Sequence, residues 1–384
     1  MLDFKDTYGH TPFDKAFDKG DVYGVGFDEA RAARRPVRLA LIGAGGVAQS
    51  KYLPAIARLR TIWEPIEIVT FVEPRADVVE KVQAIWGGRG YTEITDMLES
   101  EREQIDGVII TSPDALHADH AIACIEAGLP VLVEKPIARS LADAARMCRA
   151  ADERGILLMM VANKRFSPPY QRAKHLIESG ALSKPALFAG KFNLGYPYVD
   201  LLEAGTIHLF DLTLYLMGAV TRVSAVGGRV HLSGAGYPFD NAAMTLEFAS
   251  GAVGTLYTSA SALSFKPWER VEVYGSHAWL TVEDQYELIV YNSESGGAQS
   301  WKPVIPNTLL FDEEFGGYMG QVEHFAQAIR GAEVPRVTGW DGYRAYELLT
   351  AAHLSMARRQ PVSLPLTQES ADAEVQTWLQ TYHT

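Results

Sequence analysis

A lysine directly behind a short apolar run is the first residue whose type and position could do chemistry. Lys135 follows the segment Pro130–Glu134 and precedes Pro136. The apolar run is typical of a buried parallel strand, and open α/β sheets bind ligands beyond the carboxyl ends of such strands. An ammonium group there can donate a hydrogen bond to a substrate oxygen and stabilise negative charge that develops on it. A solvated surface lysine is the alternative, and the position at a strand end argues against it.

A second cluster, within Glu203–Asp211, contains a side chain that titrates near neutrality. His208, Asp211 and Tyr215 fall on one face of the helix predicted over Ile207–Met217. His208 could relay or remove a hydroxyl proton, and Asp211 could hold the ring in one tautomer. The alternative is a buried, hydrogen-bonded histidine beside a capping acid, and this segment alone favours that alternative.

A third cluster, Asn163-Lys164-Arg165-Phe166, follows the strand predicted over Ile156–Ala162. Its polar groups therefore lie at another carboxyl end of the predicted sheet, where contact with substrate or cofactor is expected for Asn163 and Arg165. A bridge between two domains is the alternative role for Arg165.

A glycine-rich loop joins the strand predicted over Val37–Ile42 to the helix predicted over Val47–Arg60. Gly43 allows a tight turn, Gly45 lets the backbone approach a pyrophosphate, and Ala48 keeps the helix close to the sheet. The helix N-terminus offers free N–H groups to the phosphates. An ordinary glycine-rich turn is the alternative, and the strand before and helix after favour a dinucleotide loop. The loop residues expected at the cofactor are Gly43, Ala44, Gly45, Gly46, Val47 and Ala48.

An acid ends the second predicted strand, Glu67–Val72, and bears on the choice of cofactor. Glu73 lies 30 residues after Gly43, where ~20 is usual, so a loop insertion over residues 61–66 is expected. A carboxylate there accepts hydrogen bonds from the ribose and repels a 2′-phosphate, which favours NAD over NADP. Arg75 could accept that phosphate and keeps NADP open. A stabilising acid at a helix N-terminus is the alternative role of Glu73.

The exit of the fourth predicted strand, Asp106–Thr111, supplies the floor expected beneath the cofactor. Thr111, Ser112 and Pro113 line it, and His117, on the helix predicted over Asp114–Gly128, is also expected at the cofactor. His117 and His120 could also be core-edge residues. Because no His-Glu-x-x-His motif or cysteine cluster accompanies them, a metal site is not expected. The further residues expected at the cofactor are Glu134, Lys135, Asn163 and Arg165.

Strands and helices alternate through residues 36–163, which predicts a doubly wound parallel sheet. One of these helices is predicted from an N-cap at Ser140 to a stop at Gly155. After Asn163 two amphipathic helices are followed by runs of strands with hairpin signals, which predicts a second α+β domain with a mostly antiparallel sheet over residues 164–384. Residues 1–35 form an N-terminal arm whose aromatic residues argue against full disorder. An α/β chain of two domains with an arm is therefore expected.

Composition excludes several classes of function. The 384 residues carry 35 basic against 47 acidic side chains, a net charge of −12, which argues against nucleic acid as a partner. No apolar run approaches the ~20 residues of a membrane span, and the N-terminus lacks the order of a signal peptide. Cys124 and Cys148 both fall in helical patterns, so a disulfide framework is not expected. A soluble cytoplasmic protein is the default.

These segments, in this order, resemble the Gfo/Idh/MocA family of sugar and inositol dehydrogenases from about Val37 to Leu364. The matching motifs are the glycine loop, Glu134-Lys135-Pro136, Asn163-x-Arg165-Phe166, Gly205-x-x-His208-x-x-Asp211 and Val337-Thr338-Gly339-Trp340-Asp341-Gly342.

This resemblance implies a Rossmann domain joined to a domain with a large open sheet, whose outer face pairs subunits into homodimers or homotetramers. It implies NAD(P)-dependent hydride transfer at a hydroxyl-bearing carbon of a sugar, inositol or related polyol. Lys135 would be the catalytic lysine and His208 the histidine near the reacting oxygen. The Lys135-Pro136 bond is commonly cis in the family.

One position departs from the family pattern. Many members carry an aspartate four residues before the histidine, where this chain has Ala204 beside Glu203. Three interpretations stay open: Glu203 substitutes, His208 acts with Lys135 alone, or the chemistry differs.

The substrate itself is not identified by the sequence. Specificity is expected from the loop at 191–202 and from residues 265–269. The residues expected at the substrate are Lys135, Asn163, Lys191, Tyr196, Tyr198 and His208. Two other functions remain open, a glycoside-cleaving enzyme that oxidises its substrate transiently with bound NAD, and a non-catalytic NAD(P)-sensing regulator.

Overall fold

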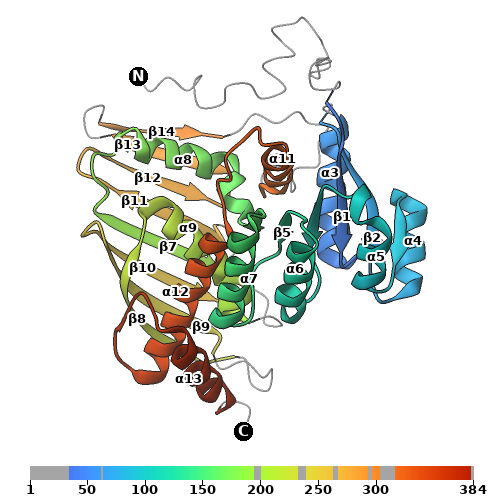
Figure 1. Ribbon diagram of the computed structural model, residues 1–384. Coiled ribbons are helices and arrows are strands. Elements are labelled where there is room, and N and C mark those ends of the chain that lie inside the picture. The colour runs from blue at the N-terminus through green and yellow to red at the C-terminus, as the bar shows by residue number, and fades with distance from the viewer. Residues whose placement is uncertain are drawn as a thin grey trace, which may run out of the picture.

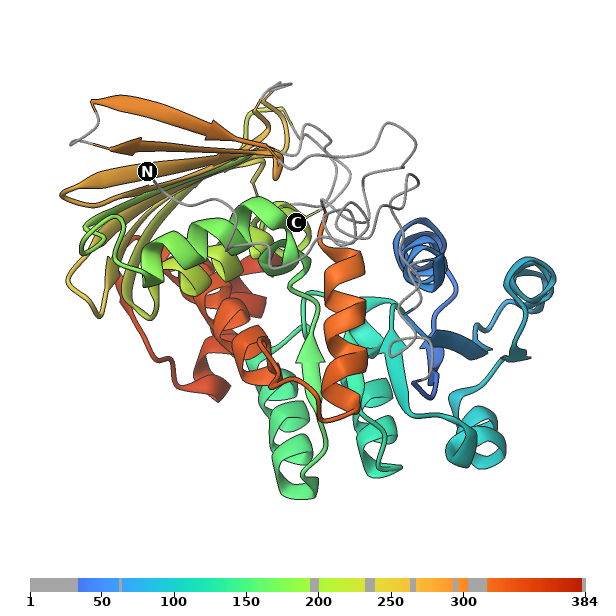
Figure 2. The same ribbon diagram turned by 90° about the horizontal axis from the view of Figure 1, so that it is seen from above.

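Two sheets lie on either side of a layer of helices in the computed structural model (Figure 1). The structure describes residues 34–61, 64–193, 200–231, 239–262, 267–292, 296–302 and 316–381. In the view from above, the larger sheet and the smaller one are separated by helices that run between them (Figure 2). The predicted α/β fold class with a second, mostly antiparallel sheet is confirmed.

The first sheet has six strands in the order β3-β2-β1-β4-β5-β6, and all of its pairs are parallel. The chain reverses its direction of travel across the sheet between β1 and β4, and dinucleotides bind at such a switch point. The strands are β1 (Val37–Ile42), β2 (Ile66–Val72), β3 (Arg89–Tyr91), β4 (Gly107–Ile110), β5 (Val131–Val133) and β6 (Leu158–Met160).

Helices connect these parallel strands. They are η2 (Ala48–Tyr52), α3 (Leu53–Thr61), α4 (Ala76–Trp86), α5 (Ile94–Glu101), η3 (Arg102–Gln104), η4 (Asp114–Leu116), α6 (His117–Glu126) and α7 (Leu141–Arg154). The predicted ends of α7 are confirmed, because Ser140 accepts a hydrogen bond from the Asp143 N–H and Gly155 takes the left-handed conformation. Helix α5 is not predicted by the sequence analysis.

The second sheet has nine strands in the order β14-β13-β12-β11-β7-β10-β9-β8-β15. Its pairs are antiparallel except for β10 beside β7, which is parallel. The strands are β7 (Leu187–Asn193), β8 (Val220–Gly228), β9 (Asn241–Phe248), β10 (Val253–Ser259), β11 (Glu269–Tyr274), β12 (Ala278–Glu283), β13 (Glu287–Asn292), β14 (Gly297–Trp301) and β15 (Val362–Ser363). Side chains alternate along β7, so Phe188 and Phe192 are buried on the face that carries helices.

Helices α8, α9 and α12 cover the inner face of the second sheet (Figure 2). The elements of this half are η5 (Asn163–Phe166), α8 (Pro168–Glu178), η6 (Leu201–Thr206), α9 (Ile207–Met217), α11 (Tyr318–Ile329), α12 (Gly339–Arg358) and α13 (Gln368–Gln380). Helix α12 begins with a reciprocal capping box between Thr338 and Asp341. The sequence analysis predicts no helix in the segment that forms α13.

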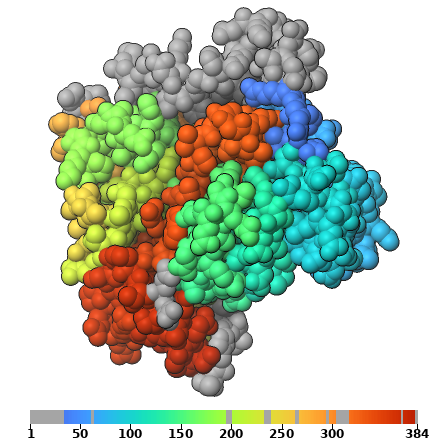
Figure 3. Space-filling model, in the orientation of Figure 1, coloured from blue at the N-terminus to red at the C-terminus, as the bar shows by residue number. Residues whose placement is uncertain are grey.

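Helix α11 comes late in the chain but packs on the first sheet. Val322 and Phe325 belong to the same buried cluster as Leu39 and Leu41 of β1. The buried Glu64 accepts a hydrogen bond from the side chain of Gln327 in α11 (3.1 Å). It accepts another from the side chain of Arg330, at the C-terminal end of that helix (2.5 Å). The orange surface of α11 accordingly lies against the blue N-terminal elements (Figure 3). The chain thus returns to its first half, and the boundary at 163/164 stays a prediction.

Two negative findings apply to the described residues. No helix among them is both long and apolar enough to span a membrane. Nor do three or more His, Cys, Asp or Glu side chains gather there in a way that could hold a metal ion. The predicted arm lies almost wholly outside the described residues, which begin at Arg34.

Candidate active site

The glycine loop after β1 lies against the exit of β4. Gly43 has a φ of 90°, and a Cβ on it would come within 2.6 Å of the Ser112 backbone nitrogen, so only glycine fits. The Thr111 hydroxyl donates to the Gly43 carbonyl oxygen at 2.6 Å. A Cβ on Gly45 would meet no described atom within 4 Å. The loop therefore leaves space beside Gly45, at the start of a helix, where a pyrophosphate fits.

Glu73 lies at the exit of β2 and reaches the same loop. Its carboxylate accepts hydrogen bonds from the Ala44 N–H (3.1 Å) and from Nε of Arg75 (2.7 Å). Burial alone would raise the pKa of Glu73, but the hydrogen bonds from Arg75 and Ala44 outweigh it and lower that pKa. An ionised carboxylate at this edge fits the hydroxyl groups of a ribose and disfavours a phosphate there.

His117 takes a different role from the one that the sequence suggests. The buried ring places Nε2 at 3.0 Å from the Ser112 carbonyl oxygen and Nδ1 at 2.8 Å from the Pro136 carbonyl oxygen. Both ring nitrogens are thus engaged with backbone groups. The expectation of a cofactor contact is corrected here: His117 holds the exits of β4 and β5 together.

Lys135 stands at the exit of β5, as predicted, and its bond to Pro136 is cis. Its Nζ donates a hydrogen bond to the Ala204 carbonyl oxygen of η6 at 3.0 Å. The buried Glu134 accepts hydrogen bonds from the Tyr52 hydroxyl (2.8 Å) and from the Lys135 N–H (2.9 Å). Glu134 therefore anchors the backbone that carries Lys135, and its two oxygens are turned toward protein donors rather than outward to a cofactor.

A narrow hollow, too small to enclose a water molecule, lies between the exits of β5 and β6 and the start of α9. Lys135 and His208, which are 73 residues apart in the sequence, lie in the same wall. The lining residues are Lys135, Met160, Val161, Ala162, Lys164, Ile207, His208 and Asp211. The structure thus brings together the two residues that the sequence analysis assigns to catalysis.

The environment of His208 favours a neutral imidazole. Burial lowers its pKa well below the ordinary value, and the ammonium groups of Lys135 and Lys164 lower it further. The ring lies 6.3 Å from that of Phe192, centroid to centroid. A neutral imidazole can accept a proton from a substrate hydroxyl.

Arg165 forms ion pairs with two acids of the predicted second domain, so its alternative role as a bridge between the two domains stays a prediction. Its guanidinium donates to both carboxylate oxygens of Asp211, at 2.6 to 3.1 Å, and reaches Asp341 at 3.4 Å. Burial raises the pKa of Asp211 although Arg165 opposes the shift. Asp211 consequently serves Arg165, and the hypothesis that it holds the ring of His208 is not supported by these contacts.

Two residues predicted at the substrate have other partners. The Asn163 amide donates to the Gly316 carbonyl oxygen at 2.6 Å. Lys191 donates to the Pro267 carbonyl oxygen at 2.5 Å, and strand alternation puts its side chain on the sheet face opposite to Phe192. The prediction for Lys191 is wrong because a period of two turns it away from the hollow. Tyr196 and Tyr198 lie outside the described residues.

Glu203, the acid beside Ala204, has its described side-chain contact on α12 rather than with His208. Its carboxyl group lies 3.5 Å from the Tyr346 hydroxyl of α12. Burial and the neighbouring Asp200 raise the pKa of Glu203 to about 7. The backbone carbonyl of Ala204, rather than an acidic side chain, receives the ammonium group of Lys135.

Lys164 lines the hollow and was not singled out from the sequence. Its buried ammonium forms an ion pair with the buried Glu269 of β11. It also lies 4.8 Å from the ring of Phe192 and 4.9 Å from that of Trp268. The sequence signal that could have identified it is its place in Asn163-Lys164-Arg165-Phe166, a segment that directly follows a predicted strand. Its partner comes from a strand about a hundred residues away, which no local pattern predicts.

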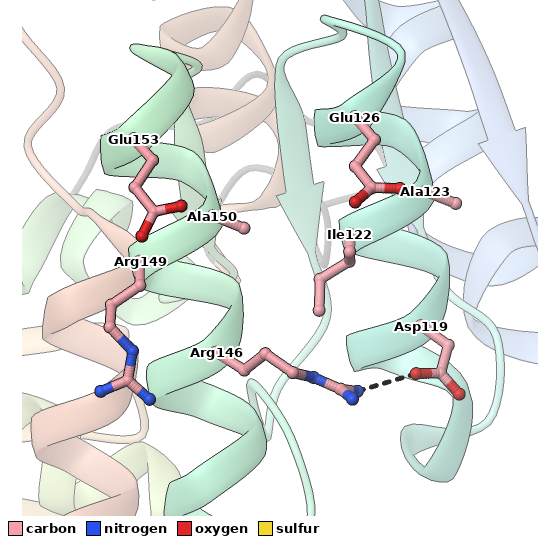
Figure 4. A pocket seen from close by; sticks show the side chains of 8 residues that line it. All are labelled: Asp119, Ile122, Ala123, Glu126, Arg146, Arg149, Ala150 and Glu153. Atoms are coloured by element: carbon pink, nitrogen blue, oxygen red, sulfur yellow. Dashed lines mark hydrogen bonds and ion pairs between the residues drawn. The ribbon is translucent and has the colours of Figure 1, made fainter.

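A second depression lies on the surface between α6 and α7 (Figure 4). It is lined by both acidic and basic side chains, and Arg146 pairs with Asp119 at 2.8 Å across it. It is built by helix side chains rather than by strand exits, so no catalytic site is assigned to it.

The strand order, the loop at the switch point and the hollow beside it are typical of a dinucleotide-binding oxidoreductase. The Gfo/Idh/MocA model described as an oxidoreductase family with an NAD-binding Rossmann fold matches residues 37–162, and that of its C-terminal alpha/beta domain matches residues 201–364. Together they cover more than half of the chain, which belongs to the Gfo/Idh/MocA family of NAD-binding oxidoreductases.

Known relatives agree with this assignment. The myo-inositol 2-dehydrogenase of Thermotoga maritima is 28% identical over 276 residues, which are 69% of this chain and 81% of the relative. The NAD(+) scyllo-inositol 2-dehydrogenase of Bacillus subtilis is 30% identical over 280 residues, 68% of this chain and 78% of the relative. A solved structure of levoglucosan dehydrogenase in complex with NADH has the same fold, with a TM-score of 0.78 at 22% identity over 87% of this chain and 100% of that one. The resemblance stated from the sequence is confirmed.

Proposed function

We propose that this protein is an NAD-dependent dehydrogenase that acts on a CH–OH group of an inositol, a sugar or a related polyol. The observation that carries the proposal is the shared hollow of Lys135 and His208 at the exit of β5, two strands from the glycine loop. The names of the inositol dehydrogenases among its relatives support the substrate class.

The residues around the glycine loop fit the cofactor. Gly43 to Ala48 would hold the pyrophosphate, Glu73 the adenosine ribose, and Thr111 to Pro113 the floor beneath the nicotinamide. When bound, NAD supplies the acceptor for the hydride that leaves the substrate carbon.

Lys135 and His208 divide the handling of the reacting oxygen. Lys135 exchanges its hydrogen bond to Ala204 for one to the substrate oxygen and stabilises the negative charge that develops there. The neutral His208 accepts the hydroxyl proton. The oxygen therefore meets one donor and one acceptor, which is what oxidation of an alcohol requires.

A preference for NAD over NADP follows from Glu73 in this proposal. Its ionised carboxylate lies next to the loop and also holds Arg75, whose guanidinium is then partly neutralised. Replacing Glu73 with Gln should narrow the ratio of kcat/KM for NAD to that for NADP. An unchanged ratio would show that Glu73 does not determine the preference for NAD over NADP.

Assembly and location complete the proposal. The outer face of the second sheet carries exposed apolar residues, among them Val226, Val253 and Tyr257, and a stack of Tyr274, Trp279 and Tyr291. We propose that a second subunit covers this face in a homodimer or homotetramer in the cytoplasm, without nucleic acid or membrane partners. The molar mass in solution, measured by light scattering, tests the assembly.

The decisive experiment measures the reduction of NAD and of NADP by the purified protein against inositols, sugars and aldonates. Turnover with a polyol that Lys135→Met abolishes, while NAD binding persists, supports the proposal. Lys81→Met, an exposed lysine of α4, is the matched control. Release of a sugar from a glycoside without net NADH would show the glycoside-cleaving alternative, and cofactor binding without turnover across the panel would show the regulatory one.

A further inference from the structure

A second lysine shares the wall of the hollow with the two residues proposed for catalysis. Lys164, in η5, is only 3% exposed, and it lines the hollow together with Lys135 and His208. The proposed mechanism does not use it. A buried cation beside a reacting group changes the energy of every protonation state around it, so its presence calls for a physical account.

The ammonium group of Lys164 is fixed in position by partners on two strands. Glu269 of β11, which has no exposed surface, forms an ion pair with it and also accepts a 2.5 Å hydrogen bond from the Tyr170 hydroxyl. Phe192 of β7 and Trp268 present their rings to the same ammonium. A buried ion pair is weak evidence for stability, since apolar replacements often match or exceed it. Burial lowers the pKa of Lys164 well below its ordinary value, and the contact with the Glu269 carboxylate opposes this shift and favours the charged form. The pair therefore holds a positive charge at a fixed place in the wall.

The groups that face His208 are mostly cationic. Burial is the largest cause that disfavours a protonated ring, and the ammonium groups of Lys135, at the exit of β5, and of Lys164, in η5, add to it from the same wall. On its own helix, Asp211 lines the hollow but has both carboxylate oxygens bound by Arg165. From the second sheet, β7 contributes the apolar ring of Phe192.

The acidic groups near this wall each have a partner other than His208. Glu269 of β11 is bound to Lys164, and Glu203 of η6 is directed to Tyr346. Ala204 offers a backbone carbonyl to Lys135 instead of a carboxylate. Among the described contacts, none joins a carboxylate to the imidazole of His208.

We propose that Lys164 is a positioning residue for the transfer step, whose ammonium, fixed by Glu269, keeps His208 in the neutral form that accepts the substrate's hydroxyl proton. This inference rests on the proposed function. In the step, the C–H bond gives its hydride to NAD, and the O–H bond gives its proton to His208. The imidazolium then lies beside two ammonium groups and releases that proton to solvent.

The same arrangement explains how the site works with alanine at position 204. A carboxylate beside the ring would stabilise the imidazolium and make the histidine a stronger base. Lys164 has the opposite effect, so His208 stays unprotonated and ready to accept at lower pH. Oxidation should therefore persist at a pH where an ordinary histidine would already be protonated.

The test compares three forms of the full-length protein by the pH dependence of kcat/KM and by an NMR titration of the His208 ring, assigned with His208→Asn. The double variant Lys164→Met/Glu269→Gln removes the charged pair and keeps an acceptor for the Tyr170 hydroxyl. We expect its acid limb and the His208 midpoint to move up by about one pH unit or more. Lys164→Arg keeps the charge and should leave both near the wild-type positions.

Controls make the result interpretable. Lys174→Met removes a lysine of α8 that bonds the Tyr215 carbonyl oxygen, away from the hollow, and should move neither readout. If the glutamine variant does not fold by circular dichroism, Lys164→Met/Glu269→Leu replaces it. A folded double variant with a wild-type His208 midpoint would overturn the inference. Because the NMR titration needs no turnover, it separates this inference from the proposed function, which fails if Lys135→Met remains active.

Discussion

The exits of β5 and β6 are neighbours in one parallel sheet, and each is followed by a lysine that reaches the same hollow. Lys135, after β5, is partly exposed and hydrogen-bonded to a backbone carbonyl oxygen of η6. Lys164, after β6, is buried and ion-paired with Glu269 of β11. The lysines that follow these two neighbouring strands thus lie in different electrostatic environments.

The difference comes from the second half of the chain. A carbonyl oxygen is a neutral partner that a substrate oxygen can replace, so Lys135 is free to change its hydrogen bond during a reaction. A buried carboxylate is an anionic partner whose loss leaves an uncompensated charge, so Lys164 stays where it is. One lysine is suited to touch the substrate and the other to supply a fixed charge.

The largest effect is expected at Lys135. Lys135→Met removes the donor that stabilises the developing oxyanion, and we expect kcat to fall by roughly 10²–10⁴-fold. Affinity for NAD, measured by fluorescence titration, should stay within about twofold because the glycine loop is untouched. Wild-type turnover in this variant would contradict the contrast between Lys135 and Lys164, since Lys135 would then not contact the reacting oxygen.

The second effect concerns folding at the exit of β6. Lys164→Met leaves the Glu269 carboxylate buried without its cation, and we expect the free energy of unfolding to fall by about 3–5 kcal/mol. Lys164→Met/Glu269→Gln should recover most of that loss. Urea unfolding at pH 7 measures both, with Lys81→Met of α4 as the exposed control. Equal losses in the single and double variants would show that the ion pair does not organise this exit.

The third effect is a pH dependence of the free energy of unfolding at Glu203. This residue precedes Ala204, whose carbonyl oxygen accepts the hydrogen bond from Lys135. The pKa of Glu203 is raised from 4.5 to about 7, so the folded state binds its proton more tightly than the unfolded state. Its cost to stability is therefore absent below about pH 4.5, grows as the pH rises through that window, and is complete above about pH 7. Glu203→Gln should add roughly 1–3 kcal/mol at pH 8 and almost nothing at pH 4.5.

Unfolding curves at the two pH values check this prediction. Glu99→Gln, at an exposed position of α5, is the matched control and should show no such dependence. A gain at Glu203 that is the same at both pH values would point to packing rather than to ionisation.

The smallest effect is expected at the start of α7, the helix after β5. Ser140→Ala removes the acceptor for the Asp143 N–H and should cost about 1 kcal/mol of stability. Because Asp372 of α13 still accepts from the N–H groups of Leu141 and Ala142, the helix should stay in place and kcat should not change. A fall in kcat would show that the exit of β5 depends on this cap.

Local sequence signals predicted most of the first sheet and its loop. The strand Val37–Ile42 matches β1, and the caps Ser140 and Gly155 bound α7 as expected. These features follow from contacts within a few residues, namely apolar runs, a cap side chain and a glycine with positive φ. Helices α5 and α13 were not predicted, although the amphipathic pattern of α5 is as strong as that of the predicted helix α4.

The sequence by itself determined the family, the fold class, the glycine loop and the candidates Lys135 and His208, because each is written in a short motif. Only the tertiary structure decided which polar groups meet: it turned Lys191 to the far face, bound Arg165 to Asp211, sent Glu203 to Tyr346 and placed Lys164 beside His208. The physical reason is that the partners come from η6, α9, α12 and β11, far away in the chain. Burial and charge, which set the protonation of His208, exist only when those elements pack together.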